Sequence, residues 1–148
     1  MTIDKLIFYM VKVIDQQKMR YLNVFGRISR VPVSDCFMYN NRLIFAVPHH
    51  KISMAIGERG ENLKRASEIL FRKSKVVALP RSTNDMGRFI SAIIYPIEYK
   101  NLEAAGDEII ITATGMENKA ELMGRNKVRL KELQDIAKQY FNKNLRII

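Results

Sequence analysis

The stretch IGERGENLKRA, Ile56 to Ala66, decides how this chain is interpreted, because two glycines three positions apart stand between an apolar lead-in and a helix-like segment. Glycine adopts positive φ without steric cost and lets the backbone approach another molecule closely. Where such a loop ends at the start of a helix, free N–H groups and the positive end of the helix dipole favour a phosphate. The alternative is an ordinary corner between two helices with surface lysines, and an isolated pair of glycines favours that alternative.

The elements expected before this loop are a helix and a strand pair. Asp15 can cap a helix over about 16–29, whose apolar residues recur at helical spacing. The stretches VPVSDCFMY and RLIFAV are typical of strands, and the pair Asn40 and Asn41 between them predicts a two-residue hairpin turn, because Asn tolerates positive φ.

A short helix over 51–56 leads into the loop, and a longer helix and the strand KVVAL follow it. The longer helix is expected to bury one side, formed by Leu63, Ala66, Ile69 and Leu70. The first part of the chain therefore has the order helix, strand, strand, helix, loop, helix, strand.

The second half of the chain repeats this order. A linker at STND precedes a helix over 86–94, strands in YPIEYKNLE and DEIIITAT around Gly106, a helix, a loop at Gly124, a helix over about 128–141 and the strand NLRII. A shift of 67 positions places Gly57 on Gly124 and Leu63 on Leu130. One offset that aligns strand, loop and helix predicts two copies of an αββααβ unit of about 65 residues.

We therefore predict an α+β protein with an N-terminal extension over 1–14, a first domain over 15–81 and a second domain over 82–148. The extension has no counterpart in the second copy and is interpreted as an added helix, an added strand or a flexible lead. The run LIFYMV is too short to span a membrane and no signal-peptide cleavage site follows it. Because the chain has 1 cysteine, a disulfide framework is excluded, and a reducing, cytoplasmic location is expected.

The positive charge of the chain is concentrated in its first half. The formal net charge is +10; through Arg81, 15 Lys and Arg oppose 6 Asp and Glu (+9), and from Ser82 onward 10 oppose 9 (+1). Lysines and arginines that neutralise phosphates release counterions, so a polyanionic partner is the leading hypothesis. The positive charge, taken alone, is explained equally well by a role in solubility.

The loop IGERG matches the I-G-x-x-G loop of KH-domain proteins, which this chain resembles. The αββααβ order is similar to the type II, or prokaryotic, KH domain, with a three-stranded mixed sheet packed against helices. Two tandem copies, with the entry segment MRYLNVFGRISRVPVSDC, resemble archaeal NusA-type transcription termination and elongation factors over roughly 15–148. The resemblance implies a protein without enzymatic activity or cofactor that binds about four nucleotides of single-stranded RNA, and RNA polymerase as a second partner.

The resemblance also implies the RNA-binding residues. In the first copy they are Ile56, Gly57, Glu58, Arg59, Gly60, Asn62, Lys64 and Arg65, and in the second copy Gly124, Arg125, Asn126 and Lys127. Glu58 weakens the attraction for a phosphate, and Lys127 replaces the second glycine with a residue whose Cβ restricts the backbone. We therefore expect the first copy to dominate RNA binding.

Other side chains beside the loop carry weaker signals. Apolar residues that form either a groove for bases or the core beneath it are Phe45, Val47, Ile56 and Leu63. Methionines at apolar helix positions are assigned to the core: Met19, Met54, Met86 and Met123. Cys36 lies in an apolar strand and is interpreted as a core thiol. His49 and His50 are adjacent, so their side chains diverge, and no further metal ligands stand at suitable spacing.

Two alternatives to a transcription factor stay open. One is a KH protein of the ribosome or of RNA processing. The other is a protein-binding scaffold whose degenerate loops no longer touch RNA, for which Glu58 and Lys127 are the main arguments.

Overall fold

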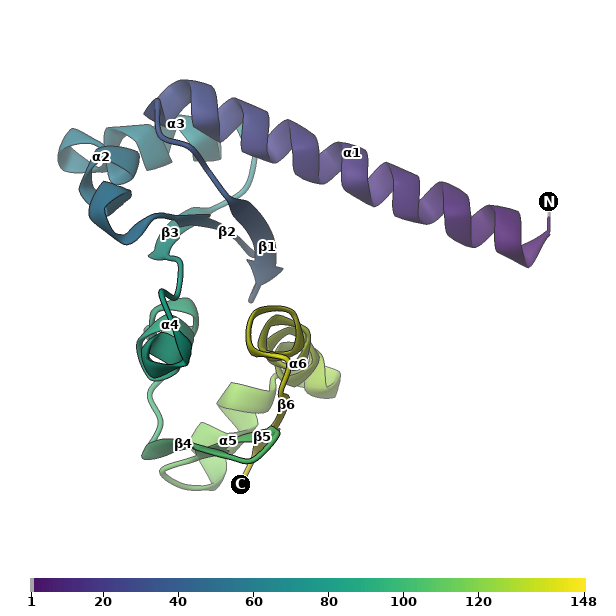
Figure 1. Cartoon of the computed structure of the whole chain (residues 1–148), viewed down its shortest axis with the longest axis vertical. Helices are drawn as coiled ribbons and strands as arrows, with labels where there is room; N and C mark the ends of the chain where they lie inside the picture. Colours follow the sequence, from purple (N-terminus) through teal and green to yellow (C-terminus); the bar gives the residue numbers. More distant parts are fainter. Residues whose placement is uncertain (1) are drawn as a thin grey trace. The chain divides into compact units, whose positions relative to one another are not determined.

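The computed structural model describes the backbone of residues 2–148 and the side chains of residues 2–7 and 16–148. The chain divides into two compact units: Met1–Phe37 with Asn41–Ala78 form the first, and Met38–Asn40 with Leu79–Ile148 form the second. Each unit combines one three-stranded sheet with helices, as Figure 1 shows. The predicted α+β class is confirmed.

The first unit has the predicted order of elements. Its elements are α1 (Ile3–Ser29), β1 (Asp35–Tyr39), β2 (Arg42–Val47), α2 (Ile52–Ile56), α3 (Glu61–Leu70) and β3 (Ser74–Ala78), with 3₁₀ turns at His49–Lys51 and Glu58–Gly60. The sheet order is β1-β2-β3, and β2 runs parallel to β3 with Leu43 opposite Ser74. Asn40 and Asn41 join β1 to β2 with φ of 52° and 61°, as the predicted two-residue turn requires.

The second unit repeats the first. Its elements are α4 (Met86–Ile94), β4 (Asn101–Ala105), β5 (Glu108–Thr112), α5 (Met116–Met123), α6 (Val128–Phe141) and β6 (Asn144–Ile147), with 3₁₀ turns at Thr83–Asp85 and Arg125–Lys127. Strand β5 pairs antiparallel with β4 and parallel with β6. The sheet is therefore mixed, as predicted.

The central strands β2 and β5 are largely buried. In β2 every residue from Leu43 to Val47 is at most 1% exposed, a continuous apolar run typical of a strand covered on both faces. The ring of Phe25 on α1 stacks on Phe45 with a centroid distance of 4.2 Å. Truncating such a ring costs about 3–5 kcal/mol. This core holds the sheet in place. Helices α2 and α3 are anchored to that sheet and position the loop between them.

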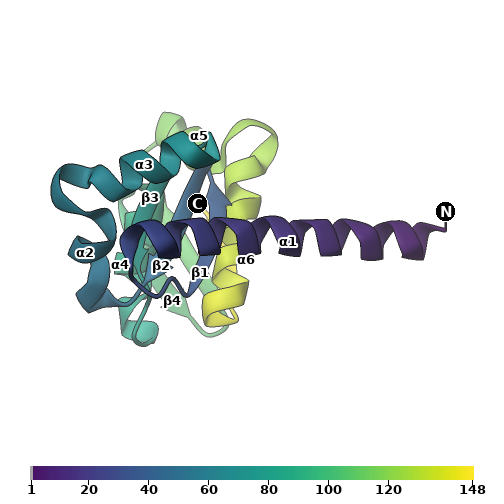
Figure 2. The ribbon, with the colours of Figure 1, turned by 90° about the horizontal axis from the view of Figure 1, so that it is seen from above.

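The first helix is longer than predicted. Helix α1 begins at Ile3, after Thr2, whose side-chain oxygen accepts a hydrogen bond from the Lys5 amide. The predicted cap at Asp15 is wrong, because that residue lies inside the helix. No Pro or Gly interrupts residues 3–15, so nothing in the backbone ends the helix there. Figures 1 and 2 show the first half of α1 extending away from the sheet of its unit.

Three further expectations need correction. The stretch YPIEYKNLE is strand only from Asn101, since residues 95–100 lie outside β4. On α3, Ala66 and Leu70 are buried as predicted, but Leu63 is half-buried and Ile69 is 45% exposed. Met86 is buried and Met123 half-buried, whereas the methionines placed wrongly in the core are Met19 and Met54. None of the helices in residues 2–148 has the length and apolar character needed to cross a membrane.

Candidate nucleic-acid interface

The loop between α2 and α3 turns through three residues with positive φ. Gly57 has φ 81° and ψ 167°, Arg59 has φ 56° and ψ 26°, and Gly60 has φ 71° and ψ 20°. A left-handed conformation costs a residue with a Cβ roughly 1–2 kcal/mol, so Arg59 is held there by its surroundings. The side chains of Glu58 and Arg59 are exposed at the tip.

Gly57 is required because of what lies against it. A Cβ at Gly57 would stand 2.8 Å from Cγ of Asn62, whereas a Cβ at Gly60 would meet nothing within 4 Å. The Asn62 side chain donates from Nδ2 to the carbonyl oxygen of Met54 at 3.1 Å. Asn62 therefore ties the start of α3 to α2 across the loop. Its predicted role in RNA binding stays a prediction.

The loop amides are only partly free. The Gly57 N–H donates to Ser53 at 3.0 Å and the Gly60 N–H donates to the Gly57 carbonyl at 3.1 Å, so the prediction of free amides is wrong for both glycines. The 3₁₀ turn itself uses these groups. The amides of Glu58 and Arg59 have no acceptor within the described part of the chain. The loop thus presents two N–H groups to a ligand.

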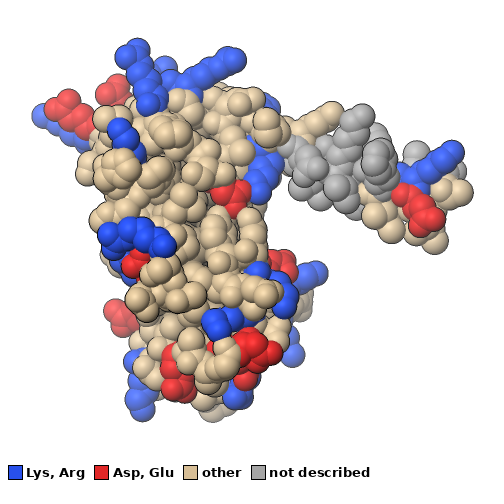
Figure 3. Space-filling model, viewed as in Figure 1, with Lys and Arg blue, Asp and Glu red and all other residues tan. Residues whose placement is uncertain are grey.

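The charged side chains around the loop form a shallow hollow of about 520 Å³ that is lined by Glu58, Arg59, Glu61 and Lys64. Arg65 is exposed but does not line it. Glu61 was not anticipated, although Glu in the first turn of a helix is favoured by the helix dipole. Two carboxylates therefore balance two cations in the hollow. Figure 3 shows further Lys and Arg side chains projecting where α1 and α3 lie.

The apolar residues near the loop separate into core and surface. Phe45 and Val47 are fully buried, so they belong to the core and cannot contact a base. Ile56 and Leu63 are half-buried beside the loop. Met54 on α2 is 54% exposed and so lies at the surface, not in the core. The apolar surface next to the loop is therefore built from helix residues.

The second unit contains the same loop with different residues. Gly124 has φ 75° and ψ 171°, Asn126 has φ 56° and ψ 27°, and Lys127 has φ 60° and ψ 27°. Lys127 was predicted to restrict the backbone, yet it adopts the left-handed conformation of Gly60. Arg129 Nη1 donates to the Glu121 carbonyl at 2.6 Å, and a Cβ at Gly124 would lie 2.8 Å from Arg129 Cγ. The sites of the repeat therefore match in shape.

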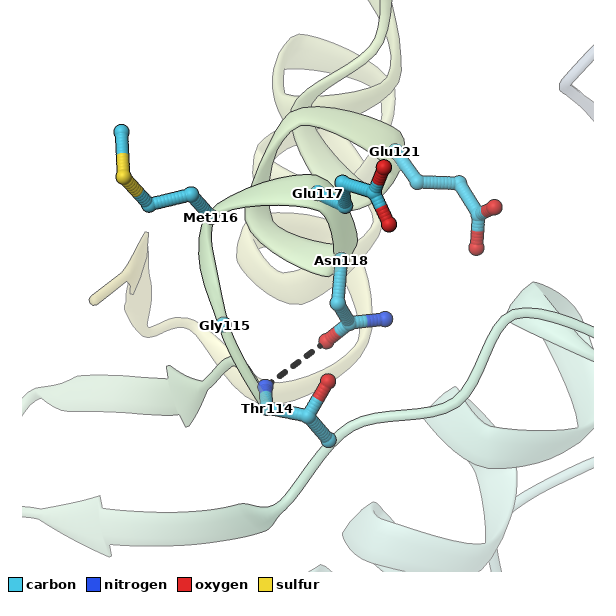
Figure 4. Close-up of a pocket in the computed structure, with 6 residues that line it drawn as sticks. All are labelled: Thr114, Gly115, Met116, Glu117, Asn118 and Glu121. Carbon is cyan, nitrogen blue, oxygen red and sulfur yellow. Dashed lines mark hydrogen bonds between the residues drawn. The ribbon is translucent and has the colours of Figure 1, made fainter.

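The helix before the second loop carries negative charge. A hollow of about 510 Å³ at its N-terminal end is lined by Thr114, Gly115, Met116, Glu117, Asn118 and Glu121. Figure 4 shows the carboxylates of Glu117 and Glu121 and the bond, 2.9 Å long, from the Thr114 amide to Asn118. The equivalent positions of the two carboxylates in the first unit are His50 and Met54. Carboxylates therefore stand on the helix before the second loop, where the first unit has none, while the second loop itself carries Arg125 and Lys127.

The remaining reactive side chains do not form a site. Cys36 is 3% exposed, and its burial raises the pKa of the thiol to about 11, so it is protonated at neutral pH. The thiol lies 3.9 Å from the carbonyl oxygen of Lys18. His49 and His50 are exposed. Within the described residues, no three His, Cys, Asp or Glu side chains are grouped to hold a metal ion.

Comparison with curated proteins finds archaeal relatives. The chain is 32% identical over 77 residues to the "Probable transcription termination protein NusA" of Methanocaldococcus jannaschii, which covers 52% of this chain and 40% of the relative. It is 26% identical over 92 residues to the protein of that name from Methanococcus vannielii, and this match covers 61% of this chain and 51% of the relative. The matches span about half the length of these relatives or less. The match to the Thermoplasma acidophilum protein of that name is 20% identical over 138 residues and covers 88% and 91%.

A solved structure has the same fold. The crystal structure of APE1850 matches with a TM-score of 0.62 and 22% identity, covering 90% of this chain and 99% of that chain. No family model matches the sequence. The predicted resemblance to archaeal NusA-type proteins is confirmed.

Proposed function

We propose that this chain is a tandem type II KH protein that binds single-stranded RNA during transcription termination or elongation. The observation that carries the proposal is the exposed Gly57–Gly60 loop, whose left-handed turn leaves the Glu58 and Arg59 amides, beside two cations, without acceptors among the described residues. The names of the similar proteins support the link to transcription. RNA polymerase as a partner, a cytoplasmic location and the absence of an enzymatic activity are parts of this proposal.

A phosphate of the RNA would sit at the loop tip. The amides of Glu58 and Arg59 donate to its oxygens, and the guanidinium of Arg59 and the ammonium of Lys64 add charge-assisted hydrogen bonds, which are about twice as strong as neutral ones. Ile56 and Leu63, half-buried next to the loop, offer apolar surface against which a base can lie. Arg65 follows on the exposed side of α3 and can meet the next phosphate.

The carboxylates of Glu58 and Glu61 keep this site moderate in strength. Both line the hollow with Arg59 and Lys64, so a phosphate meets repulsion as well as attraction there. If about three phosphates are neutralised, the logarithm of the affinity falls with the logarithm of the salt concentration with a slope of about −2. Binding is therefore expected at low salt and is lost progressively at high salt.

The second domain contributes less. Arg125, Asn126 and Lys127 are exposed and repeat the loop shape, and the Arg125 and Asn126 amides have no acceptor in the described residues. The carboxylates of Glu117 and Glu121 on the preceding helix oppose a phosphate approaching this unit. We therefore assign it weaker contacts with the strand.

The experiment that tests the site is a gel shift with short single-stranded RNAs. The double substitution Arg59→Asp with Gly60→Asp should abolish binding, because it replaces the cation with carboxylates. The fold should persist, since a Cβ at Gly60 meets nothing within 4 Å and Asp tolerates positive φ better than most residues. The matched control is Arg125→Asp with Lys127→Asp, which should reduce affinity only slightly. Unchanged binding by the first variant would overturn the assignment.

A protein-binding scaffold is the second candidate, and the observation that favours it is the pair of carboxylates, Glu58 and Glu61, in the loop hollow. Failure of the natural protein to bind any RNA of the panel at low salt would favour the scaffold. Co-purification of the full chain with RNA polymerase, and not with ribosomal subunits, is expected for the transcription role.

A further inference from the structure

A phenylalanine ring stands in solvent at the far end of α3. The side chain of Phe71 is 91% exposed, and its backbone is left-handed with φ 54°. Burial of this ring would release about 1.5–3 kcal/mol, and the left-handed backbone costs roughly 1–2 kcal/mol more than a glycine there. The ring therefore adds nothing to the stability of its own unit, and its surface is available to another molecule.

Two cations follow this ring directly in the sequence, and two more stand on the strands β2 and β3. We call the set formed by Arg42, Phe71, Arg72, Lys73 and Lys75 the Phe71 patch. Arg72 and Lys73 are exposed, and the Leu43 amide bonds to the Lys73 carbonyl at 2.8 Å, so the start of β2 is held beside the segment leading to β3. Burial and the nearby Arg42 charge both lower the pKa of Lys75.

Three of the four cations of the patch have no acidic partner among the described side chains. Within the described side chains, no ion pair includes Arg42, Arg72 or Lys73. The nearest acidic residue in the sequence is Glu68, about one turn earlier on α3. The local potential is therefore positive and attracts an anion to the place where the ring is exposed.

The patch is also held in place before any ligand arrives. The Phe71 amide donates to the Ser67 carbonyl, and the Arg72 amide donates to the same oxygen at 3.3 Å. The Arg72 side chain donates from Nε to the hydroxyl of Tyr21 on α1 at 3.3 Å. An aromatic ring and a guanidinium fixed in this way lose little conformational freedom on binding.

We infer that the Phe71 patch is a second contact for single-stranded RNA, in which a base stacks on Phe71 while Arg72 and Lys73 bind phosphates. Exposed aromatic rings next to cations are how proteins bind single strands without reading their sequence. The inference rests on the proposed function and extends it. Helix α3 has 10 residues and separates the patch from the loop by about 15 Å, so only a strand longer than the four or so nucleotides held by the loop reaches both.

The first test uses strand length. Phe71→Leu keeps an apolar side chain and removes the ring, and it should weaken binding of a strand of about ten nucleotides roughly tenfold, while binding of a four-nucleotide RNA is unchanged. The matched control, Met116→Leu, alters a side chain that is equally exposed (91%) in the second unit and should change neither affinity. Equal affinity of Phe71→Leu and the natural protein for the longer strand would overturn the inference.

The second test uses fluorescence. The chain has no tryptophan, so Phe71→Trp creates a single reporter, whose emission should be quenched when the longer strand stacks on it. Met116→Trp should not be quenched. An unquenched Phe71→Trp protein that still binds RNA overturns the inference and leaves the loop proposal intact, whereas quenching that survives Arg59→Asp with Gly60→Asp supports the patch and contradicts the loop.

The third measurement separates binding from stability. Phe71→Gly removes the ring and relieves the left-handed strain, so its midpoint of thermal unfolding should rise while its affinity for the longer strand falls. A residue with a purely structural role cannot move these two quantities in opposite directions. A fall in both would contradict the inference.

Discussion

Asn62 and Arg129 lie at equivalent positions of the two units, and each donates a side-chain N–H to the backbone carbonyl eight residues before it, Met54 at 3.1 Å and Glu121 at 2.6 Å. Each side chain also occupies the space that a Cβ on the preceding loop glycine would need. An amide and a guanidinium thus perform the same task. The shape of the loop depends on this bond between its two helices in both units.

The two glycines of the first loop should respond differently to substitution. Gly57→Ala places a Cβ 2.8 Å from Asn62 at φ +81°, so it should destabilise the first unit by about 2 kcal/mol or more. Gly60→Ala meets no neighbour and should cost about 1 kcal/mol from its φ alone. Urea unfolding of both variants measures the difference. Equal losses would contradict the role assigned to the contact with Asn62.

The second loop should be stabilised by restoring the glycine that it lacks. Lys127 has φ 60°, and this backbone conformation is the one reason to expect that glycine is more stable there. Lys127→Gly should therefore raise the free energy of unfolding of its unit by about 1 kcal/mol. Arg125→Gly is the control, because Arg125 is not among the residues with positive φ and should lose stability instead. Thermal unfolding monitored by circular dichroism compares the two.

Removing the negative charge at the loop tip should strengthen RNA binding. Glu58 lines the hollow with Arg59 and Lys64, and Glu58→Gln removes its repulsion of a phosphate while keeping the side-chain size. An exposed charge of this kind is worth about 0.2–1 kcal/mol, so the dissociation constant should fall by up to roughly fivefold. Fluorescence anisotropy with a short RNA at low salt gives the value, and Glu103→Gln on β4 serves as the control.

Asp85 should make the second unit sensitive to acid. Hydrogen bonds from the backbone and side chain of Arg81 and the charge of Arg88 lower the pKa of this carboxyl from 3.8 to about 2. Because the folded-state pKa is depressed, the stabilisation is present above about pH 4 and is lost as the pH falls towards 2. Asp85→Asn should therefore lower the unfolding midpoint at pH 7, and this difference should vanish near pH 2. A difference that persisted there would contradict the role of the charge.

Much of the fold follows from the sequence because its signals are local. The offset that places Gly57 on Gly124 predicted the repeat, and the matching backbone angles at the two loops confirm it. Asn40 and Asn41 predicted their turn from their tolerance of positive φ. The predicted start of α1 was wrong because Asp15 is a good capping residue. A capping residue begins a helix only where the preceding residues are not helical, and no residue before Asp15 breaks the helix.

The details of the candidate site were harder to predict because they depend on packing. Helical spacing assigns Ile69 to the buried side of α3, but it does not say how far the neighbouring elements reach along that side. The bond from Asn62 to Met54 joins two helices and leaves no pattern in the sequence. The 3₁₀ turn that uses the Gly57 carbonyl likewise depends on the path of the whole loop.

The left-handed Lys127 has a wider meaning for how duplicated domains diverge. The hydrogen bonds of Asn62 and Arg129 come from outside the two loops and determine the path of each loop. The residues at the loop tips are therefore not needed to set that path. One domain can keep a loop tip that binds anions while the loop tip of the other acquires a different binding chemistry. The helices that flank the loops do not have to change in either domain. The two domains thus share the backbone geometry of the loop, whereas the ligand specificity of each loop evolves independently.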